Sequence, residues 1–298
     1  MLMSHGKLAP SLVLLLLVSS LMPLVGCDGG PKRRGPQNYT EYRAINDPRY
    51  RGAKGGAVED TGDGDFGPTS GEVSVTSSDA IRTGTVPNSG TVKGMVKYTG
   101  KASKPKKINN SKTGYCVEAA TLYREDLLVS NSGGLQNVVV YISKGFQRFE
   151  FEPSASPFQI NQQACRYVPH IVAAMAGQEL AIQNSDKTPH NYHFSGLANP
   201  GINKTQAVPT TNTEVLENPE VGASFACDIH PWMQAPVYIF KHPYFTVSSE
   251  DGSFEIKNLP AGTYQISFAH ERNDMKTVVQ TVTIEPGKEV AINAEISR

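Results

Sequence analysis

Short runs of alternating apolar and polar residues, separated by turn-forming residues, fill the chain from residue 90 to its end. Such runs are typical of half-buried β-strands, and helical periodicity is almost absent. Many short strands with turns between them favour sandwiches or barrels, so we expect an all-β fold. The expected strands are 91–98, 135–142, 171–174, 179–183, 236–240, 245–247, 253–256, 264–269, 278–284 and 290–296. The pattern leaves open which other strands 91–98 pairs with.

The first 26 residues have a different pattern, with Lys7 before apolar runs over 12–18 and 21–25. These runs are too short to span a membrane comfortably, because a membrane-spanning helix needs about 20 apolar residues. The segment is therefore interpreted as an export signal. It ends in Leu24-Val25-Gly26-Cys27, which resembles a bacterial lipobox and implies cleavage before Cys27 and a lipid on its sulfur. Simple secretion and a retained anchor helix are the alternatives. All three place the chain outside the cytoplasm, in the periplasm or at the cell surface, and a lipid would tether it to a membrane.

Residues 27–89 are rich in Gly, Pro, Asp, Arg and Ser, and they contain no sustained apolar period. This composition predicts a disordered linker. Its basic residues are concentrated before residue 55, and its acidic residues follow from Glu59 to Asp79. The linker is interpreted as a solvated spacer, with contact between its basic half and anionic headgroups as the alternative. The formal net charge of the whole chain is zero, so nucleic acid is not an expected partner.

The C-terminal residues 244–298 carry two turn signals, Asp251-Gly252 and Pro260-Ala261-Gly262, between short strands. This stretch resembles the carboxypeptidase regulatory-like, or transthyretin-like, β module. The resemblance implies a small β-sandwich and carries no firm implication for function.

Candidate chemistry is concentrated in Cys227-Asp228-Ile229-His230-Pro231-Trp232-Met233, which holds a thiol, an imidazole and a thioether. A second imidazole, that of His190, follows the apolar strand 180–182 and a polar turn. Two cysteines with a histidine would suggest zinc, whereas this set favours copper. A thiolate, two imidazoles and a weak axial thioether are the ligands of a blue-copper electron-transfer centre.

The spacing Cys227-x2-His230-Pro231-x-Met233 resembles the ligand loop of the cupredoxins, most closely the amicyanin type. The resemblance implies a Greek-key β-sandwich over 90–243 that binds one type 1 copper per chain through His190, Cys227, His230 and Met233. The thiolate would couple the metal electronically, and the axial thioether would raise its potential.

The resemblance also implies roles for neighbouring residues. Asn191 would brace the cysteine loop by hydrogen bonds. Asp228 stands where the family often has Ser or Thr, and it would either lower the potential or face solvent. The family exposes the loop histidine in an apolar patch. This makes Pro189, Pro231 and Trp232 candidates for docking a redox protein partner, with Trp232 packing over the loop as the alternative.

His193 and His170 are weaker candidate ligands, whereas His242 and His270 are expected at the surface. With Cys227 on the metal and Cys27 lipidated, an oxidising compartment favours a disulfide between Cys116 and Cys165. Two buried free thiols are the alternative.

The sequence therefore predicts a membrane-tethered, extracytoplasmic blue-copper protein that carries single electrons and is not an enzyme. A periplasmic copper store or chaperone and a metal-free structural or adhesion protein are the alternatives. The chain contains no His-x-His pair, nucleophile elbow, phosphate loop, HExxH motif or paired-cysteine zinc motif.

Overall fold

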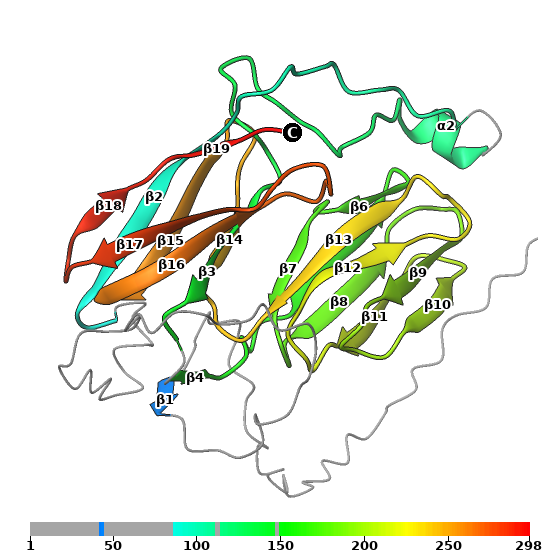
Figure 1. Cartoon of the computed structure of the whole chain (residues 1–298). Helices are drawn as coiled ribbons and strands as arrows, with labels where there is room; N and C mark the ends of the chain where they lie inside the picture. Colours follow the sequence, from blue (N-terminus) through cyan, green and yellow to red (C-terminus); the bar gives the residue numbers. More distant parts are fainter. Residues whose placement is uncertain (1–41, 45–85, 111–113, 147–148) are drawn as a thin grey trace, which may run out of the picture. The chain divides into compact units, whose positions relative to one another are not determined.

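The computed structural model of the chain describes residues 42–44, 86–110, 114–146 and 149–298 (Figure 1). The expected signal segment, the lipidation site Cys27 and most of the expected linker 27–89 lie outside these ranges. Among the described residues, no helix combines the length and the apolar character needed to cross a membrane. The fold is all-β, as the alternating pattern predicted, and α2 (Tyr115–Ala119) is the one short helix within the described ranges.

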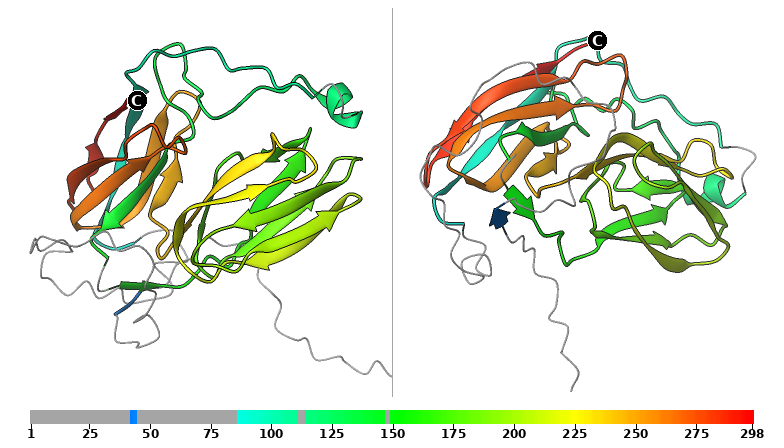
Figure 2. Two further views of the ribbon diagram at one scale, coloured as in Figure 1. Left: turned by 45° about the vertical axis from the view of Figure 1, so that its right-hand side comes forward. Right: turned by 60° about the horizontal axis from the view of Figure 1, so that its bottom comes forward.

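Most described strands belong to two β-sandwiches (Figures 1 and 2). One sheet of the first sandwich has the order β10 (Ile202–Gln206), β9 (His190–Ser195), β12 (Glu220–Ala226), β13 (Gln234–Phe240) and β7 (Val172–Met175). The other has the order β11 (Thr210–Val215), β8 (Glu179–Asn184), β5 (Phe158–Gln163) and β6 (Arg166–Val168). Residues from both sheets, such as Ile182 and Phe225, are fully buried in one core cluster.

The second sandwich is built from strands at both ends of the described chain. One of its sheets has the order β14 (Phe245–Val247), β3 (Val139–Lys144), β16 (Gly262–Ala269) and β17 (Val278–Ile284). The other has the order β15 (Ser253–Pro260), β2 (Ser89–Tyr98) and β18 (Glu289–Ala291), and β19 (Ala294–Ile296) also pairs with β2. A separate two-stranded sheet joins β1 (Tyr42–Ala44) to β4 (Phe149–Phe151).

Strand pairing differs from the expected division of the chain at residue 244. Strand β2 pairs with β15 along an antiparallel register that runs from Ser253 opposite Met95 to Pro260 opposite Ser89, and β3 pairs with β16. Both strands therefore belong to the second sandwich. Alternation shows that one face of a strand is buried, but it does not show against which sheet, because pairing partners lie far apart in the sequence.

Between β2 and β3, the described residues 99–110 and 114–138 form a connecting arm that runs out to α2 and back (Figure 1). The arm leaves the second sandwich after Tyr98 and returns to its core at Leu127 and Leu135. At α2, Cys116 is joined to Cys165 of the first sandwich by the expected disulfide, and both cysteines are fully buried. The disulfide therefore links the arm, which connects two strands of the second sandwich, to the core of the first sandwich.

Two histidines expected at the surface are buried. His242 and His270 are each 9% exposed. The ring of His242 lies between two backbone groups: Nε2 donates to the carbonyl of Ile142 at 2.8 Å, and Nδ1 accepts from the N–H of Tyr244 at 3.3 Å. These contacts fix a neutral tautomer, because a proton on Nδ1 would oppose the Tyr244 N–H. Burial lowers the pKa of His242 from 6.5 to about 4.

This buried histidine predicts that stability falls on mild acidification. Between pH 6.5 and about 4, the unfolded chain binds a proton at residue 242 that the folded chain does not, so stability rises with pH in this window. The expected loss on going from neutral pH to pH 4 is about 2–3 kcal/mol from this residue. Denaturant unfolding of the wild-type protein and of His242→Gln at several pH values measures it. An equal slope in both proteins would contradict the prediction.

Candidate metal centre

The predicted ligands gather at one end of the first sandwich. His190 is the first residue of β9, Cys227 directly follows β12, and Met233 directly precedes β13. Strands β9 and β12 are antiparallel neighbours, with Ala226 opposite His193, so the start of one strand lies beside the end of the other. All four side chains are buried: His190 is 0% exposed, Met233 1%, Cys227 2% and His230 4%.

The loop from Cys227 to Met233 is closed by its own backbone. The N–H of Cys227 donates to the carbonyl of Met233 at 3.0 Å, and the N–H of Met233 donates to the carbonyl of His230 at 2.8 Å. These two bonds turn the chain between adjacent strands β12 and β13. They bring the thiol of Cys227 and the thioether of Met233 into the same core cluster, and the buried imidazole of His230 lies 3.8 Å from the thiol.

Three donor atoms face one point. Nδ1 of His190 lies 3.0 Å from Nδ1 of His230, and Sγ of Cys227 lies 4.0 Å from the first and 3.8 Å from the second. Metal bonds are about 2.0 Å to nitrogen and about 2.3 Å to sulfur, so these three atoms could hold one ion. A trigonal Cys-His-His set is the arrangement that type 1 copper uses, so these residues fit copper.

Asp186 fixes the protonation of His190. Its Oδ2 lies 2.9 Å from Nε2 of the ring, so the ring proton is held there and the lone pair of Nδ1 faces the other donors. Burial lowers the pKa of both His190 and His230, against the opposing effect of Asp186 on His190. Both rings are therefore neutral at neutral pH, which is the state that can bind a metal.

His230 is not at the surface, contrary to what the family resemblance implied. Its Nε2 lies 3.4 Å from the disulfide sulfur of Cys116, and the Trp232 ring lies 5.2 Å from its own ring, centre to centre. The indole Nε1 of Trp232 donates to the carbonyl of Cys165 at 3.1 Å. Trp232 is half-buried and packs against the core, as in the alternative interpretation of this residue. The histidine is covered because the connecting arm places Cys116 over it.

Asn191 joins the two ligand-bearing strands in the way that the resemblance implied. Its Oδ1 accepts from the N–H of Asp228 at 2.7 Å, and its Nδ2 donates to the carboxylate of Asp228 at 2.9 Å. Asp228 also accepts from Asn203 and contacts His193, and its side chain is 53% exposed. Hydrogen bonds from His193 and Asn203 hold the pKa of Asp228 below its ordinary value, so a negative charge lies next to Cys227.

Replacing Asn191 with alanine is expected to loosen the cysteine loop. The substitution removes the acceptor for the Asp228 N–H, so Cys227 loses the anchor that holds it near His190. Outer partners of metal ligands typically contribute about 10- to 100-fold in metal affinity, and we expect a loss of this size. Competition with a copper chelator measures it. Asn203→Ala removes one bond to the Asp228 side chain and one from Nδ2 of Asn191, but it keeps the acceptor of the Asp228 N–H. It is therefore the matched control and should bind nearly as well as the wild-type protein.

Two residues that sequence reasoning missed support the centre. The sequence places Asp186 in a polar turn without a role, whereas in the structure this residue is only 2% exposed. The hydroxyl of Tyr167 lies 2.9 Å from the carbonyl of Asn191 and 3.1 Å from that of Ala226, so it bridges the strands that carry His190 and Cys227. Burial, with the nearby Cys227 and Asp228, raises the pKa of Tyr167. A signal was available for Asp186: it precedes His190 by four residues on the same turn.

The weaker candidate ligands lie elsewhere. His193 contacts Asp228 at 3.0 Å, and its side chain is 42% exposed. Nε2 of His170 lies 2.6 Å from the carboxylate of Glu271. Burial lowers the pKa of His170, but the hydrogen bond and charge of Glu271 and the charge of Glu125 outweigh it, so the pKa is raised. Neither ring belongs to the group of donors formed by His190, Cys227 and His230.

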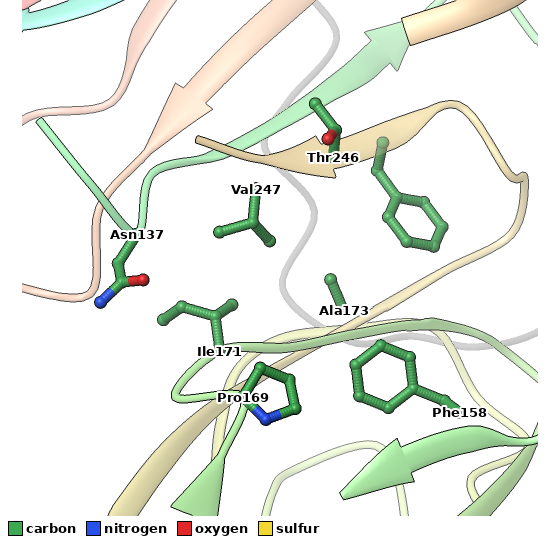
Figure 3. Close-up of a pocket in the computed structure, with 8 residues that line it drawn as sticks. Asn137, Phe158, Pro169, Ile171, Ala173, Thr246 and Val247 are labelled. Carbon is green, nitrogen blue, oxygen red and sulfur yellow. The ribbon is translucent and has the colours of Figure 1, made fainter. Parts of the chain in front are cut away.

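None of these donors lines the cavity of about 340 Å³ that Figure 3 shows. Its lining is almost entirely apolar, with Phe158, Ile171 and Val247 on its walls and Asn137 at one side. None of its lining residues has a titratable or metal-binding side chain. The cavity therefore offers no chemistry comparable to that of the metal centre.

No protein-family model matches the chain, and no curated protein matches it. Among solved structures, it resembles part of a copper-containing nitrite reductase from Thermus scotoductus SA-01, with 14% identity and a TM-score of 0.27 over 30% of this chain and 26% of that one. A purple cupredoxin from Nitrosopumilus maritimus matches with 22% identity and a TM-score of 0.24, over 28% and 98% of the two chains. A Cu(I) amicyanin mutant matches with 15% identity and a TM-score of 0.26, over 30% and 86%. The chain thus spans about a quarter of the nitrite reductase.

Proposed function

We propose that the first sandwich is a cupredoxin that binds one type 1 copper per chain and carries single electrons. The observation behind this proposal is the group formed by Nδ1 of His190, Nδ1 of His230 and Sγ of Cys227, which are separated by 3.0, 3.8 and 4.0 Å in a buried site. When bound, copper supplies a one-electron couple between Cu(I) and Cu(II). Met233 is the proposed axial ligand, because its buried side chain belongs to the same core cluster.

The surrounding residues suit electron transfer better than bond chemistry. Asp186 holds one imidazole, the disulfide sulfur of Cys116 covers the other, and Asn191 braces the thiolate loop. Ligands held by several contacts change position little between oxidation states, which keeps reorganisation small. A buried four-ligand set also leaves no open position for a substrate, whereas catalytic metal sites keep one. We therefore propose no enzymatic activity.

The proposed location is extracytoplasmic, with a lipid on Cys27 as the membrane anchor. The disulfide between Cys116 and Cys165 supports an oxidising compartment. A redox protein is the proposed partner, and the exposed residues next to the centre, Pro189, Ile229 and Pro231, are the proposed contact. Mass spectrometry of the protein from membranes tests the anchor, because it would show an acylated Cys27 at a new N-terminus.

Copper loading tests the proposed function. The purified chain loaded with Cu(II) should show the intense visible absorption of a thiolate-to-copper charge transfer and should exchange electrons rapidly between its Cu(I) and Cu(II) forms. A colourless Cu(II) complex would contradict the proposal. Tight Cu(I) binding with slow electron exchange would favour the copper store or chaperone. A chain that retains no copper would favour a structural or adhesion protein.

A further inference from the structure

One structural unit contacts the outer nitrogen of His230 directly and binds the carboxylate that contacts the outer nitrogen of His190. We call this unit the disulfide clamp and define it as Cys116, Cys165 and the helix residue Tyr115. On one side, Sγ of Cys116 lies 3.4 Å from Nε2 of His230. On the other side, the clamp reaches His190 through the carboxylate of Asp186.

Asp186 links the clamp to His190 through four contacts. Its Oδ2 lies 2.9 Å from Nε2 of His190 and accepts from the N–H of Cys165 at 2.8 Å. Its Oδ1 accepts from the N–H of Ala164 at 2.8 Å and from the hydroxyl of Tyr115 at 3.3 Å. The carboxylate is buried, and these donors supply the hydrogen bonds that a buried carboxylate requires. The orientation of His190 is therefore connected to the backbone of Cys165 and to α2.

The clamp covers the centre and does not bind the metal in this state. Cys116, Cys165 and His230 lie close enough to hold an ion as a group of three. The two sulfurs are bonded to each other, however, so neither offers a thiolate. Trp232 completes the cover, because its indole donates to the carbonyl of Cys165 while its ring packs beside that of His230.

We propose that the Cys116–Cys165 disulfide is a clamp that positions both imidazole ligands and seals the metal centre from solvent, with Asp186 as the positioning residue that transmits it to His190. The identity of the metal rests on the proposed function, but the seal does not. Tyr115 and Cys116 of the clamp lie in the connecting arm, so a segment between two strands of the second sandwich helps to cover the metal centre of the first. Opening the clamp would expose Nε2 of His230 to water.

Chemical modification of the metal-free full chain tests the seal without copper. Diethyl pyrocarbonate acylates accessible neutral imidazoles, and mass spectrometry reports each histidine separately. In the wild-type protein, His230 should react as slowly as the buried His242, whereas the exposed His193 should react fast. In Cys116→Ala with Cys165→Ala, His230 should react nearly as fast as His193 while His242 remains slow. An unchanged rate at His230 would overturn the seal.

A fast reaction at His242 would reveal that the double cysteine variant is unfolded. Variants that keep the disulfide test the clamp in that case. Asp186→Asn and Tyr115→Phe each remove contacts between the clamp and His190 while leaving Cys116 and Cys165 bonded. Asp186→Asn is expected to weaken Cu(I) binding by about 10- to 100-fold, with Tyr115→Phe showing a smaller effect in the same direction. Asp274→Asn, at an exposed ion pair with Arg272 of the second sandwich, is the matched control.

The midpoint potential separates positioning from a purely structural role. A carboxylate on Nε2 strengthens His190 as a donor and favours Cu(II), so Asp186→Asn should raise the potential while Asp274→Asn leaves it unchanged. A wild-type protein that is not blue, but whose His230 becomes reactive when the clamp is removed, would refute the proposed function and support the clamp. A blue protein whose Asp186→Asn variant keeps its affinity, potential and His230 protection would refute the clamp alone.

Discussion

Replacing Cys227 with serine is expected to abolish the intense visible absorption of the Cu(II)-loaded protein while leaving the fold intact. The absorption requires a thiolate bound to the metal, and Cys227 is the free cysteine among the described residues, since Cys116 and Cys165 are bonded to each other. A serine hydroxyl is a hard, neutral oxygen donor that does not ionise at neutral pH, and copper in a blue centre requires a soft anionic sulfur. Absorption spectroscopy of the loaded variant makes the measurement.

The fold should tolerate this substitution because the loop does not depend on the sulfur. Its closing bonds use the backbone of Cys227, Met233 and His230, and Asn191 anchors the backbone of Asp228. Thermal unfolding of the metal-free proteins should therefore agree closely.

Met233→Leu is the matched control for the cysteine variant. The two side chains have similar volumes, so the core should repack with a cost below about 1.5 kcal/mol. This variant keeps all three donors of the trigonal group and removes only the weak axial thioether. It should stay coloured with a shifted potential. A Cys227→Ser protein that retains the intense band, or a Met233→Leu protein that loses it entirely, would contradict the proposed ligand roles.

The ligand loop could be predicted from the sequence because its chemistry is local. Cys227, His230 and Met233 lie within seven residues. A short loop between two adjacent strands allows few conformations, so their side chains must lie close together. Placing His190 beside them required one non-local step, which the apolar strand before it and the polar turn made possible. The structure brings its ring nitrogen within 4.0 Å of the Cys227 sulfur.

The cover of the site could not be predicted, because it comes from remote parts of the chain. Cys116 lies 114 residues before His230 and reaches it through a connection between two strands of the other sandwich. Nothing in the local sequence of Cys116 distinguishes a disulfide beside an imidazole from one on the far side of the sheet. Asp186 was missed for a related reason, since a carboxylate in a polar turn is usually solvated and this one is buried.

Two edge strands of the first sandwich were also missed, and their position explains why. Strands β10 and β11 lie at the edges of their sheets and have polar sequences, Ile202-Asn203-Lys204-Thr205-Gln206 and Thr210-Thr211-Asn212-Thr213-Glu214-Val215. An edge strand with little burial lacks the apolar alternation that signals a strand, and polar residues at edges also discourage pairing with other chains. The strands that were predicted are mostly those with one face in a core.

Removing the disulfide with Cys116→Ala and Cys165→Ala is expected to lower the free energy of unfolding by about 4 kcal/mol. The bond joins residues 49 apart, and closing a loop of this length removes about this much conformational entropy from the unfolded chain. Both cysteines are fully buried in the core of the first sandwich. Alanine keeps these positions apolar, so the loss of the crosslink should dominate over the loss of two sulfur atoms.

Fluorescence of Trp232 during denaturant unfolding measures this loss of unfolding free energy in the first sandwich. Trp232 is the chain's single tryptophan, and its indole donates to the carbonyl of Cys165, so its emission reports on the clamped end of the first sandwich. Reducing the wild-type protein before unfolding is the control, because it breaks the same bond without removing either sulfur and should give a similar midpoint. A shift below about 1 kcal/mol in both would contradict the prediction, and it would mean that the unfolded chain is already compact enough for the crosslink to restrict little.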